Sequence, residues 1–415
     1  MPAQEPLNYP QPVSPPDGGL PLSLGGNTLA DLDARASYDV VVIGAGVIGL
    51  SVGWRCACRG ASTLVLDAAE PGRGATHAAA GMLAPVSEAN FGEQNLIALN
   101  LESARRYPAF VAELESETGM VTGYRPSGAL TVALDRDQAE LLRQMNQFQA
   151  SLDLDAQWLS APECRALEPG LAPSVVGGIR SSVDHQVSPR ALASVLAAAL
   201  ERAGGELRTN TPIASVNVES DRVTGVTLKS GKRVAAGQVV VAAGWQSGDL
   251  DGIPDDARVP VRPVKGQIIR LRGDRNAPVA RQVVATPEIY IVPRDDGRVI
   301  VGATVEERGA DTTVTAGGVF ELLRAAYEAL PGISELELVE AMAGLRPAAP
   351  DNEPIIGRSI LEGLFWTTAH WRNGILLAPV TADAAAAAIA GEDMPEVLAP
   401  FTPDRFARPP AVALR

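Results

Sequence analysis

Runs and alternations of apolar residues along the chain predict an α/β fold. Residues 38–43 form an almost purely apolar run, which is typical of a strand buried on both faces of a parallel sheet. Apolar positions at helical spacing predict helices elsewhere, and period-two alternation predicts strands in the middle of the chain. The predicted helices cover residues 96–118, 137–150, 191–203 and 319–329, and a last helix begins near Gly374. Further strands are predicted at residues 61–66, 127–133, 212–218, 223–228, 233–236, 238–245, 266–272, 288–293 and 299–303.

The order of these elements predicts a discontinuous Rossmann-like domain and a second domain. The nucleotide-binding domain would comprise residues 38–124, 180–250 and 341–404, which carry the buried strands. The strand-rich segments between them, residues 125–179 and 251–340, would form an antiparallel-sheet-rich α+β substrate domain. We expect the active site where these two domains meet, because ligand sites favour domain interfaces.

The strongest motif is the join between the first strand and a glycine-rich turn. Residues 38–43 lead directly into Gly44-Ala45-Gly46-Val47-Ile48-Gly49, and a helix-forming segment follows. Gly44 permits a tight turn, Gly46 allows a pyrophosphate to approach the backbone, and Gly49 allows close packing of the helix on the strand. Asp67 ends the second strand, where an acceptor for ribose hydroxyls is expected. Together these features predict dinucleotide binding.

This glycine pattern occurs once, which favours a single flavin. Flavin enzymes that take electrons from a nicotinamide usually carry a second nucleotide site, and disulfide reductases need a redox-active cysteine pair; the sequence contains neither motif. We therefore expect electrons to pass from a small substrate to one bound flavin and then to oxygen or another acceptor. Gly244, at the end of the apolar segment 238–245, is expected to touch that cofactor.

Composition narrows the function classes further. The 415 residues suffice for two domains, and the net charge of −14 without a Lys/Arg block disfavours nucleic-acid and anionic-membrane binding. No apolar run reaches the roughly 18 residues of a membrane span. The three cysteines and three histidines show no metal-ligand spacing, so no metal site is expected. Residues 1–37, rich in Pro and Gly, predict a disordered or loosely packed leader rather than a signal peptide, which favours a cytoplasmic protein.

Two arginines near the C-terminus suggest a carboxylate site. Arg346 lies in Gly344-Leu345-Arg346-Pro347, and Arg372 precedes Asn373-Gly374. Burying an arginine without a partner costs free energy, and a planar guanidinium suits a carboxylate held by two parallel hydrogen bonds. The alternative for Arg346 is a structural ion pair with Asp351 or Glu353.

Three further features each have a functional and a structural interpretation. Asn373-Gly374, before an apolar segment, would place a helix N-terminus beside the flavin, or form an ordinary turn. Tyr290 alternates with apolar neighbours and would point its hydroxyl into a cavity, or pack in the core. His370 is the most plausible histidine base, and the alternative is a packing residue.

Taken together, these segments resemble the glycine oxidase branch of the D-amino-acid oxidase family from residue 38 to about residue 404. The most specific motifs are Ala78-Ala79-Ala80-Gly81-Met82-Leu83-Ala84-Pro85, Gly344-Leu345-Arg346-Pro347 and Arg372-Asn373-Gly374-Ile375-Leu376-Leu377-Ala378-Pro379. The resemblance implies non-covalent FAD, hydride transfer from the substrate Cα to flavin N5, and conversion of glycine, sarcosine and small D-amino acids to imines while O2 becomes peroxide. It also implies a homotetramer and a role in forming the thiamine thiazole, with thiazole synthase as a partner.

The same resemblance implies roles for individual residues. Arg346 would bind the substrate carboxylate, Arg372 would line the same pocket, Tyr290 would bond or cover the carboxylate, and Met82 would lie over the flavin. Glu288 stands where the family carries a histidine, and a carboxylate there would repel acidic substrates or attract the substrate ammonium. The resemblance places FAD contacts at Val47, Ile48, Asp67, Ala68, Ala75, Thr76, Ala80, Gly81, Met82, Ile213, His370, Trp371, Arg372, Asn373, Gly374, Ile375 and Leu376.

Two other functions remain open at this point. One is a D-amino-acid dehydrogenase that passes electrons to a quinone, which requires a surface that docks on a membrane. The other is a flavin-binding module without turnover. The arginine pair and the tyrosine argue against such a module, because a protein that only binds flavin has no use for a carboxylate site.

Overall fold

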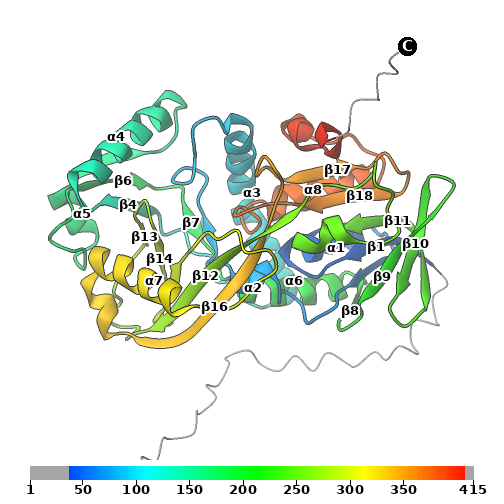
Figure 1. Ribbon diagram of the computed structural model, residues 1–415, viewed down its shortest axis with the longest axis horizontal. Coiled ribbons are helices and arrows are strands. Elements are labelled where there is room, and N and C mark those ends of the chain that lie inside the picture. Colours follow the sequence, from blue (N-terminus) through cyan, green and yellow to red (C-terminus); the bar gives the residue numbers. More distant parts are fainter. Residues whose placement is uncertain (1–36, 407–415) are drawn as a thin grey trace, which may run out of the picture. The chain divides into compact units, whose positions relative to one another are not determined.

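Two eight-stranded sheets organise residues 37–406, the part of the chain that the computed structural model describes (Figure 1). In the first sheet, the predicted apolar strand β1 (Ser37–Ile43) lies at the centre, and its last four residues are buried. It runs parallel to β2 (Thr63–Leu66) on one side and to β11 (Arg233–Val241) on the other. The path of this sheet is β17 (Ile355–Arg358), β18 (Leu364–Thr368), β11, β1, β2 and β8 (Glu206–Arg208), and β10 (Arg222–Leu228) and β9 (Ile213–Glu219) extend it from β11.

Four helices form the apolar core with this sheet. Helix α1 (Val47–Cys58) contacts α6 (Pro189–Arg202) and α8 (Ala378–Ile389), and α3 (Gln94–Thr118) contacts the same two helices. The buried face of α8 consists mostly of alanine, whose small side chain lets α1 approach closely. Because α1 follows β1 directly, its N-terminus lies at the carboxyl end of the central strand, where ligands bind in sheets of this type.

The second sheet is largely antiparallel, as predicted for the middle of the chain. The strand order is β16 (Glu337–Ala348), β12 (Arg262–Arg272), β15 (Arg298–Gly302), β14 (Tyr290–Pro293), β13 (Val283–Ala285), β4 (Ala129–Ala133), β6 (Gly177–Ser181) and β5 (Gln157–Ser160). The one parallel pair of this sheet joins β13 to β4. Helix α7 (Ala316–Ala329) packs on β12 and β15, and α4 (Arg136–Ser151) packs on β4 and β6.

Short elements complete the described chain. They are α2 (Ala75–Ala78), α5 (Ala161–Leu167), the paired strands β3 (Met82–Leu83) and β7 (His185–Gln186), and 3-10 helices at Gly244–Asp249, Pro331–Glu335, Glu396–Phe401 and Pro403–Phe406. The predicted leader lies outside the described residues except for Ser37, which begins β1. The domain boundaries stay a prediction.

Two expectations about local structure are wrong. Helix α8 begins at Ala378 rather than near Gly374, because residues 374–377 form a turn in which the Leu377 amide donates to the Asn373 carbonyl. Pro379 then occupies the first helical turn, where its missing N–H costs nothing. The segments 233–236 and 238–245 are one continuous strand that ends at Val241, because β11 pairs with β1 along nearly its whole length.

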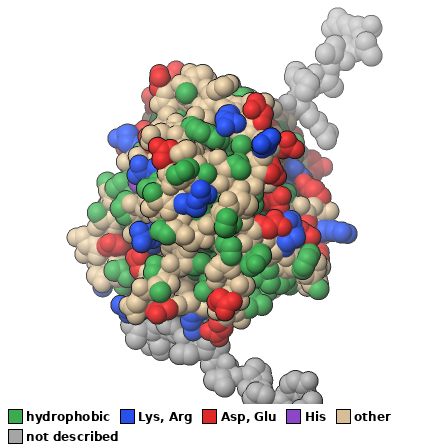
Figure 2. Space-filling view, turned by 90° about the vertical axis from the view of Figure 1, so that its left-hand side faces the viewer, with side chains coloured by type: hydrophobic (Ala, Val, Ile, Leu, Met, Phe, Trp, Pro, Cys, Tyr) green, Lys and Arg blue, Asp and Glu red, His purple; other side chains and the backbone are tan. Residues whose placement is uncertain are grey.

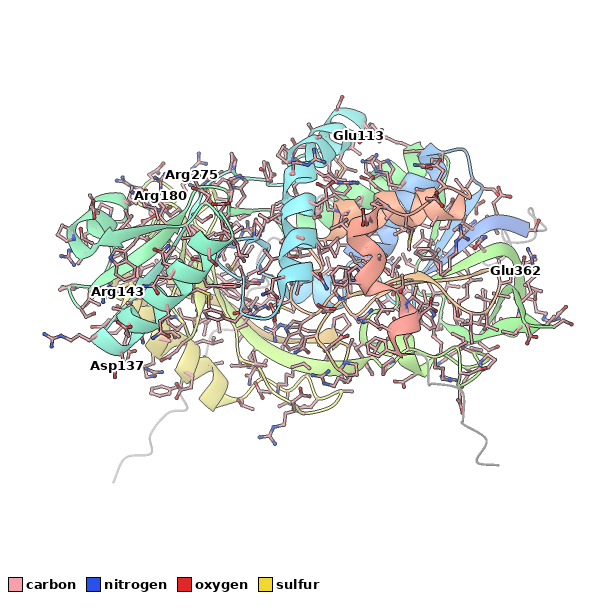
Figure 3. All side chains as sticks on the ribbon, turned by 90° about the horizontal axis from the view of Figure 1, so that it is seen from above. Glu113, Asp137, Arg143, Arg180, Arg275 and Glu362 are labelled. Carbon is pink, nitrogen blue, oxygen red and sulfur yellow. The ribbon has the colours of Figure 1, made fainter. Side chains whose placement is uncertain are left out.

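Charged residues of both signs intermingle on the face shown in Figure 2. Figure 3 shows Asp137 and Arg143 on α4 beside the second sheet, and Glu362 on the opposite side, beside the first sheet. All three lie outside the cavity described below. Among residues 37–406, no helix combines the length and the apolar character needed to cross a membrane.

Candidate active site

A cavity of about 960 Å³ is lined by residues from both sheets, and its volume is typical of a large cofactor site. Every predicted site residue except Gly49 lines it. Chain segments that are distant in sequence therefore meet there: the turn after β1, the segment around α2, strands β14 and β16, and residues 370–376.

The glycines of the turn after β1 meet steric requirements that another residue would violate. Gly44 has φ +106°, and a Cβ there would overlap the Ala242 carbonyl. A Cβ on Gly49 would overlap the Gly44 carbonyl, so Gly49 permits the close packing of helix on strand that the motif predicts. Gly46 is the N-cap of α1 and lines the cavity, so its backbone faces any ligand held at the helix N-terminus.

Asp67 directly follows β2, and its carboxylate can accept more hydrogen bonds than the protein donates to it. Its Oδ2 accepts from the Ala45 amide at 2.6 Å and its Oδ1 from the Ala69 amide at 2.8 Å. Burial raises the pKa of Asp67, while these two amides oppose the shift. A carboxylate offers about four lone-pair sites, so two remain for a ligand such as a ribose hydroxyl.

Three arginines that were not predicted from the sequence, one buried and two partly buried, hold the backbone in and beside the alanine-rich segment. Arg270 donates to the His77 carbonyl at 3.0 Å, Arg190 donates to the same carbonyl at 3.2 Å, and Arg294 donates to the Ala80 carbonyl. Burial together with the nearby arginines lowers the pKa of Arg270 to about 10 and that of Arg294 to about 9. These residues leave the cavity side of the segment free. Their signal in the sequence was weak, because each lies alone in a different strand, loop or helix.

Arg346 projects from β16 across a glycine of the neighbouring strand. A Cβ on Gly266 would overlap the Arg346 guanidinium, so the absence of a side chain there makes room for it. The guanidinium donates to the Thr304 carbonyl at 3.1 Å, and no salt bridge joins it to a carboxylate of residues 37–406. The alternative of a structural pair with Asp351 or Glu353 is wrong, because Asp351 pairs with Arg405 at 2.8 Å and no salt bridge among residues 37–406 joins Arg346 to Glu353.

Tyr290 lines the same cavity beside Arg346. It pairs directly with Gly302 across β14 and β15, and a Cβ on Gly302 would overlap its ring. Burial raises the pKa of Tyr290, the Arg346 guanidinium lowers it, and the carboxylate of Glu88 raises it again. The phenol therefore stays protonated at neutral pH.

Arg372 occupies another part of the cavity wall and has a charged partner. Its Nε lies 3.4 Å from Glu88 Oε2, and its Nη2 donates to the Glu88 carbonyl at 3.3 Å. Sequence reasoning missed Glu88, because this residue precedes α3 in an irregular segment without a recognisable motif. Glu288 also lines the cavity, but its carboxylate pairs at 3.1 Å with Arg324 on α7.

His370 is buried and neutral. Its Nε2 lies 3.1 Å from Thr381 Oγ1 on α8, and burial lowers its pKa to about 3. This environment favours the packing interpretation over a general base, which needs a pKa near the working pH. The neighbouring Trp371 has φ +48° and lies 5.8 Å from the Arg346 guanidinium carbon. The alternative of an ordinary turn at Asn373-Gly374 is confirmed, since α8 begins only at Ala378.

Met82 lies in β3 within a small apolar cluster. It packs with Tyr290, Met342, Ala80 and Ile268 between the alanine-rich segment and the second sheet. The cluster gives one side of the cavity an apolar surface next to the polar pair of Arg346 and Tyr290. This arrangement suits a flat, partly apolar ring bound beside a small carboxylate.

Comparisons with known proteins agree with this geometry. A family model described as "DAO: FAD dependent oxidoreductase" matches residues 39–388. The chain is 34% identical over 370 residues to a glycine oxidase of Geobacillus kaustophilus, covering 88% of this chain and 96% of the relative. The crystal structure of glycine oxidase from that organism superposes with a TM-score of 0.84 at 33% identity, over 89% of this chain and 99% of the other.

A second kind of relative is longer than this chain. The "Bifunctional protein ThiO/ThiG" of Trichormus variabilis is 36% identical over 371 residues, which cover 89% of this chain and 55% of the relative. The chain therefore spans about half the length of the bifunctional relatives that it matches.

Proposed function

Because this chain belongs to the family of FAD-dependent oxidoreductases, we propose that it oxidises glycine, sarcosine and small D-amino acids to the corresponding imines. In each turnover the substrate loses two electrons and two protons, and O2 takes up both as H2O2. The observation that carries the proposal is the guanidinium of Arg346. It lies in the cavity beside Tyr290, without a carboxylate partner among the described residues. The named relatives are glycine oxidases, which supports this substrate class.

The cavity residues fit a non-covalently bound FAD. The turn at Gly44 and Gly46 supports a role in holding a pyrophosphate, and Asp67 has lone pairs left for the ribose. The alanine-rich segment and residues 370–376 would enclose the flavin ring. When bound, FAD supplies the two-electron acceptor for the hydride of the substrate Cα.

The roles proposed for the substrate residues are binding and orientation. Arg346 binds the substrate carboxylate, Tyr290 donates its phenolic hydrogen to it, and Met82 limits the room for a substrate side chain. Holding the reactants in a reactive geometry can contribute about 7–11 kcal/mol to lowering the barrier. Hydride loss from the neutral amine needs no protein base at Cα, which agrees with the neutral, buried state of His370.

A role in thiazole formation for thiamine is part of the proposal. The ThiO/ThiG relatives carry a second portion, which this chain does not span. By their name they support thiazole synthase as a protein that consumes the imine. The expected homo-oligomer stays a prediction.

Mixing the holoenzyme anaerobically with glycine, sarcosine, D-alanine or D-proline tests the proposal. We expect loss of the oxidised-flavin absorbance with at least one of these substrates, and peroxide in a one-to-one ratio with imine once air is admitted. Bleaching without peroxide would favour the quinone-linked dehydrogenase. A flavin that none of them bleaches would favour the non-catalytic module and overturn the proposal.

A further inference from the structure

The cavity contains an ion pair that the proposed reaction does not use. Glu88 and Arg372 face each other with 3.4 Å between Oε2 and Nε, and both line the cavity. Their side chains are 24% and 37% exposed, so the pair is partly shielded from water. Arg372 also donates to the Glu88 backbone carbonyl, which connects the two residues at a second point.

Buried polar side chains fix the position of Glu88. The carboxylate of Asp184, which is 1% exposed, accepts from the amides of Val86 and Ser87 at 3.0 and 2.8 Å. The Gln149 side chain, also 1% exposed, donates to the Val86 carbonyl at 3.0 Å. These three bonds hold the backbone immediately before Glu88, so its carboxylate occupies a defined place. Most ion pairs between flexible surface side chains lack such support.

The two arginines predicted at the carboxylate site differ in their partners. Arg346 has no carboxylate partner among residues 37–406, whereas Arg372 is neutralised by Glu88. The ring centroid of Trp371, the residue before Arg372, lies 5.8 Å from the guanidinium carbon of Arg346, so the pair lies near the place where the substrate carboxylate would bind. The carboxylate of Glu288, which also lines the cavity, is neutralised by Arg324, which lies outside it.

We infer that Glu88 determines the charge of the substrate: by occupying Arg372, it makes the cavity select monocarboxylates and exclude molecules with a second carboxylate. The inference deepens the proposed function and rests on it. Specificity of this kind comes from an unfavourable interaction with the wrong ligand as much as from attraction to the right one. A second carboxylate would have to displace Glu88 from Arg372 and would meet a like charge.

Binding of non-oxidisable anions tests the inference separately from turnover. Acetate and malonate differ by one carboxylate, and their Kd values for the holoenzyme can be measured by isothermal titration calorimetry. In Glu88→Gln we expect the ratio of the malonate Kd to the acetate Kd to fall about tenfold, because Arg372 becomes free for the second carboxylate. In the double variant Glu88→Gln/Arg372→Gln the ratio returns toward the wild-type value. Glu88→Asp, which keeps the charge, is expected to retain the wild-type ratio.

Glu321→Gln is the matched control, because it removes a carboxylate that is paired with an arginine, Arg324, but lies outside the cavity. Its Kd ratio is expected to equal that of the wild type. An unchanged ratio in Glu88→Gln overturns the inference, and so does a fall that persists in the double variant. If Glu88→Gln fails to bind FAD, Glu88→Ser removes the same charge with a smaller side chain.

Turnover supplies a second measurement with a matched substrate pair. Sarcosine and iminodiacetate differ by one carboxylate on the N-substituent. The ratio of kcat/KM for iminodiacetate to that for sarcosine is expected to rise about tenfold in Glu88→Gln. A wild-type enzyme that oxidises neither glycine nor sarcosine would refute the proposed function. Active enzyme with an unchanged ratio would refute the role of Glu88 alone.

Discussion

The two ends of the cavity are built in opposite ways. The proposed nucleotide end, made by the turn at residues 44–49 and by Asp67, consists mainly of backbone groups from one stretch of chain. The proposed substrate end, made by Arg346, Tyr290 and Arg372, consists of side chains from β16, β14 and a turn, which lie far apart in sequence. Steric limits shape the first end, whereas charge balance and cross-strand packing shape the second.

This difference determines how each end responds to mutation. A side chain added to the nucleotide end collides with the backbone, so the damage affects folding and cofactor binding together. A side chain removed from the substrate end leaves the sheet intact, so the damage is confined to the substrate. The predictions below test this separation.

The largest effect is expected for Gly49→Val. The new side chain would overlap the Gly44 carbonyl, and neither backbone segment can move without disturbing the packing of α1 on β1. We expect a loss of about 3 kcal/mol in unfolding free energy and an FAD content below about a tenth of wild type. Gly317→Ala is the control, since a Cβ there meets nothing within 4 Å. Normal flavin absorbance in Gly49→Val would show that this turn does not hold the cofactor.

The next effect is expected for Arg346→Ala. Loss of the guanidinium removes the proposed partner of the substrate carboxylate, and kcat/KM should fall by about a thousandfold, mainly through KM. FAD content and thermal stability should stay close to wild type, because the side chain contributes a hydrogen bond to the Thr304 carbonyl but no ion pair. Steady-state kinetics with glycine and sarcosine measure this effect. An unchanged KM in this variant would show that Arg346 does not bind the substrate.

The smallest effect on catalysis is expected for His370→Asn, a substitution at another residue that lines the cavity. If this residue only packs against Thr381, turnover should change less than about tenfold, whereas loss of a catalytic base would cost more. A fall of turnover by a thousandfold would instead assign His370 to the chemistry.

The stability of the same variant should depend on pH with a defined sign. Burial lowers the pKa of His370 from 6.5 to about 3, so the unfolded chain binds a proton there more readily than the folded protein. This contribution to stability is complete above pH 6.5 and is lost as the pH falls toward 3. Between pH 7.5 and pH 5, wild type should lose about 2 kcal/mol more unfolding free energy than His370→Asn in denaturant titrations.

The nucleotide end could be predicted from the sequence almost completely. Its strand, turn and helix are consecutive, and the roles of Gly44 and Gly49 follow from steric limits that a short motif states. The same holds for β1, β2 and β11 of the first sheet, whose hydrophobic runs are visible without any partner, whereas β8, β17 and β18 of that sheet were not predicted.

For the substrate end, the residues could be predicted from the sequence, but the strand that carries Arg346 and the partner of Arg372 could not. Strand β16 was missed because its alanines, its glycine and Pro347 disfavour a strand locally, and only pairing with β12 makes it one. Glu88 was missed for a related reason. Its importance depends on Arg372, which lies 284 residues away in the chain. Contacts of this range leave no periodic or local signal.

The contacts of Arg346 with Gly266 and of Tyr290 with Gly302 limit which substitutions these glycines can accept. Neither has a side chain to offer a substrate, yet the guanidinium of Arg346 and the ring of Tyr290 lie directly on them. A single methyl group at either position would raise the overlying group by more than the roughly 0.5 Å that a working site tolerates. Selection for Arg346 and Tyr290 therefore also requires glycine at the position beneath each of them on the neighbouring strand. Substitutions at these two glycines should be tolerated as poorly as substitutions of Arg346 itself.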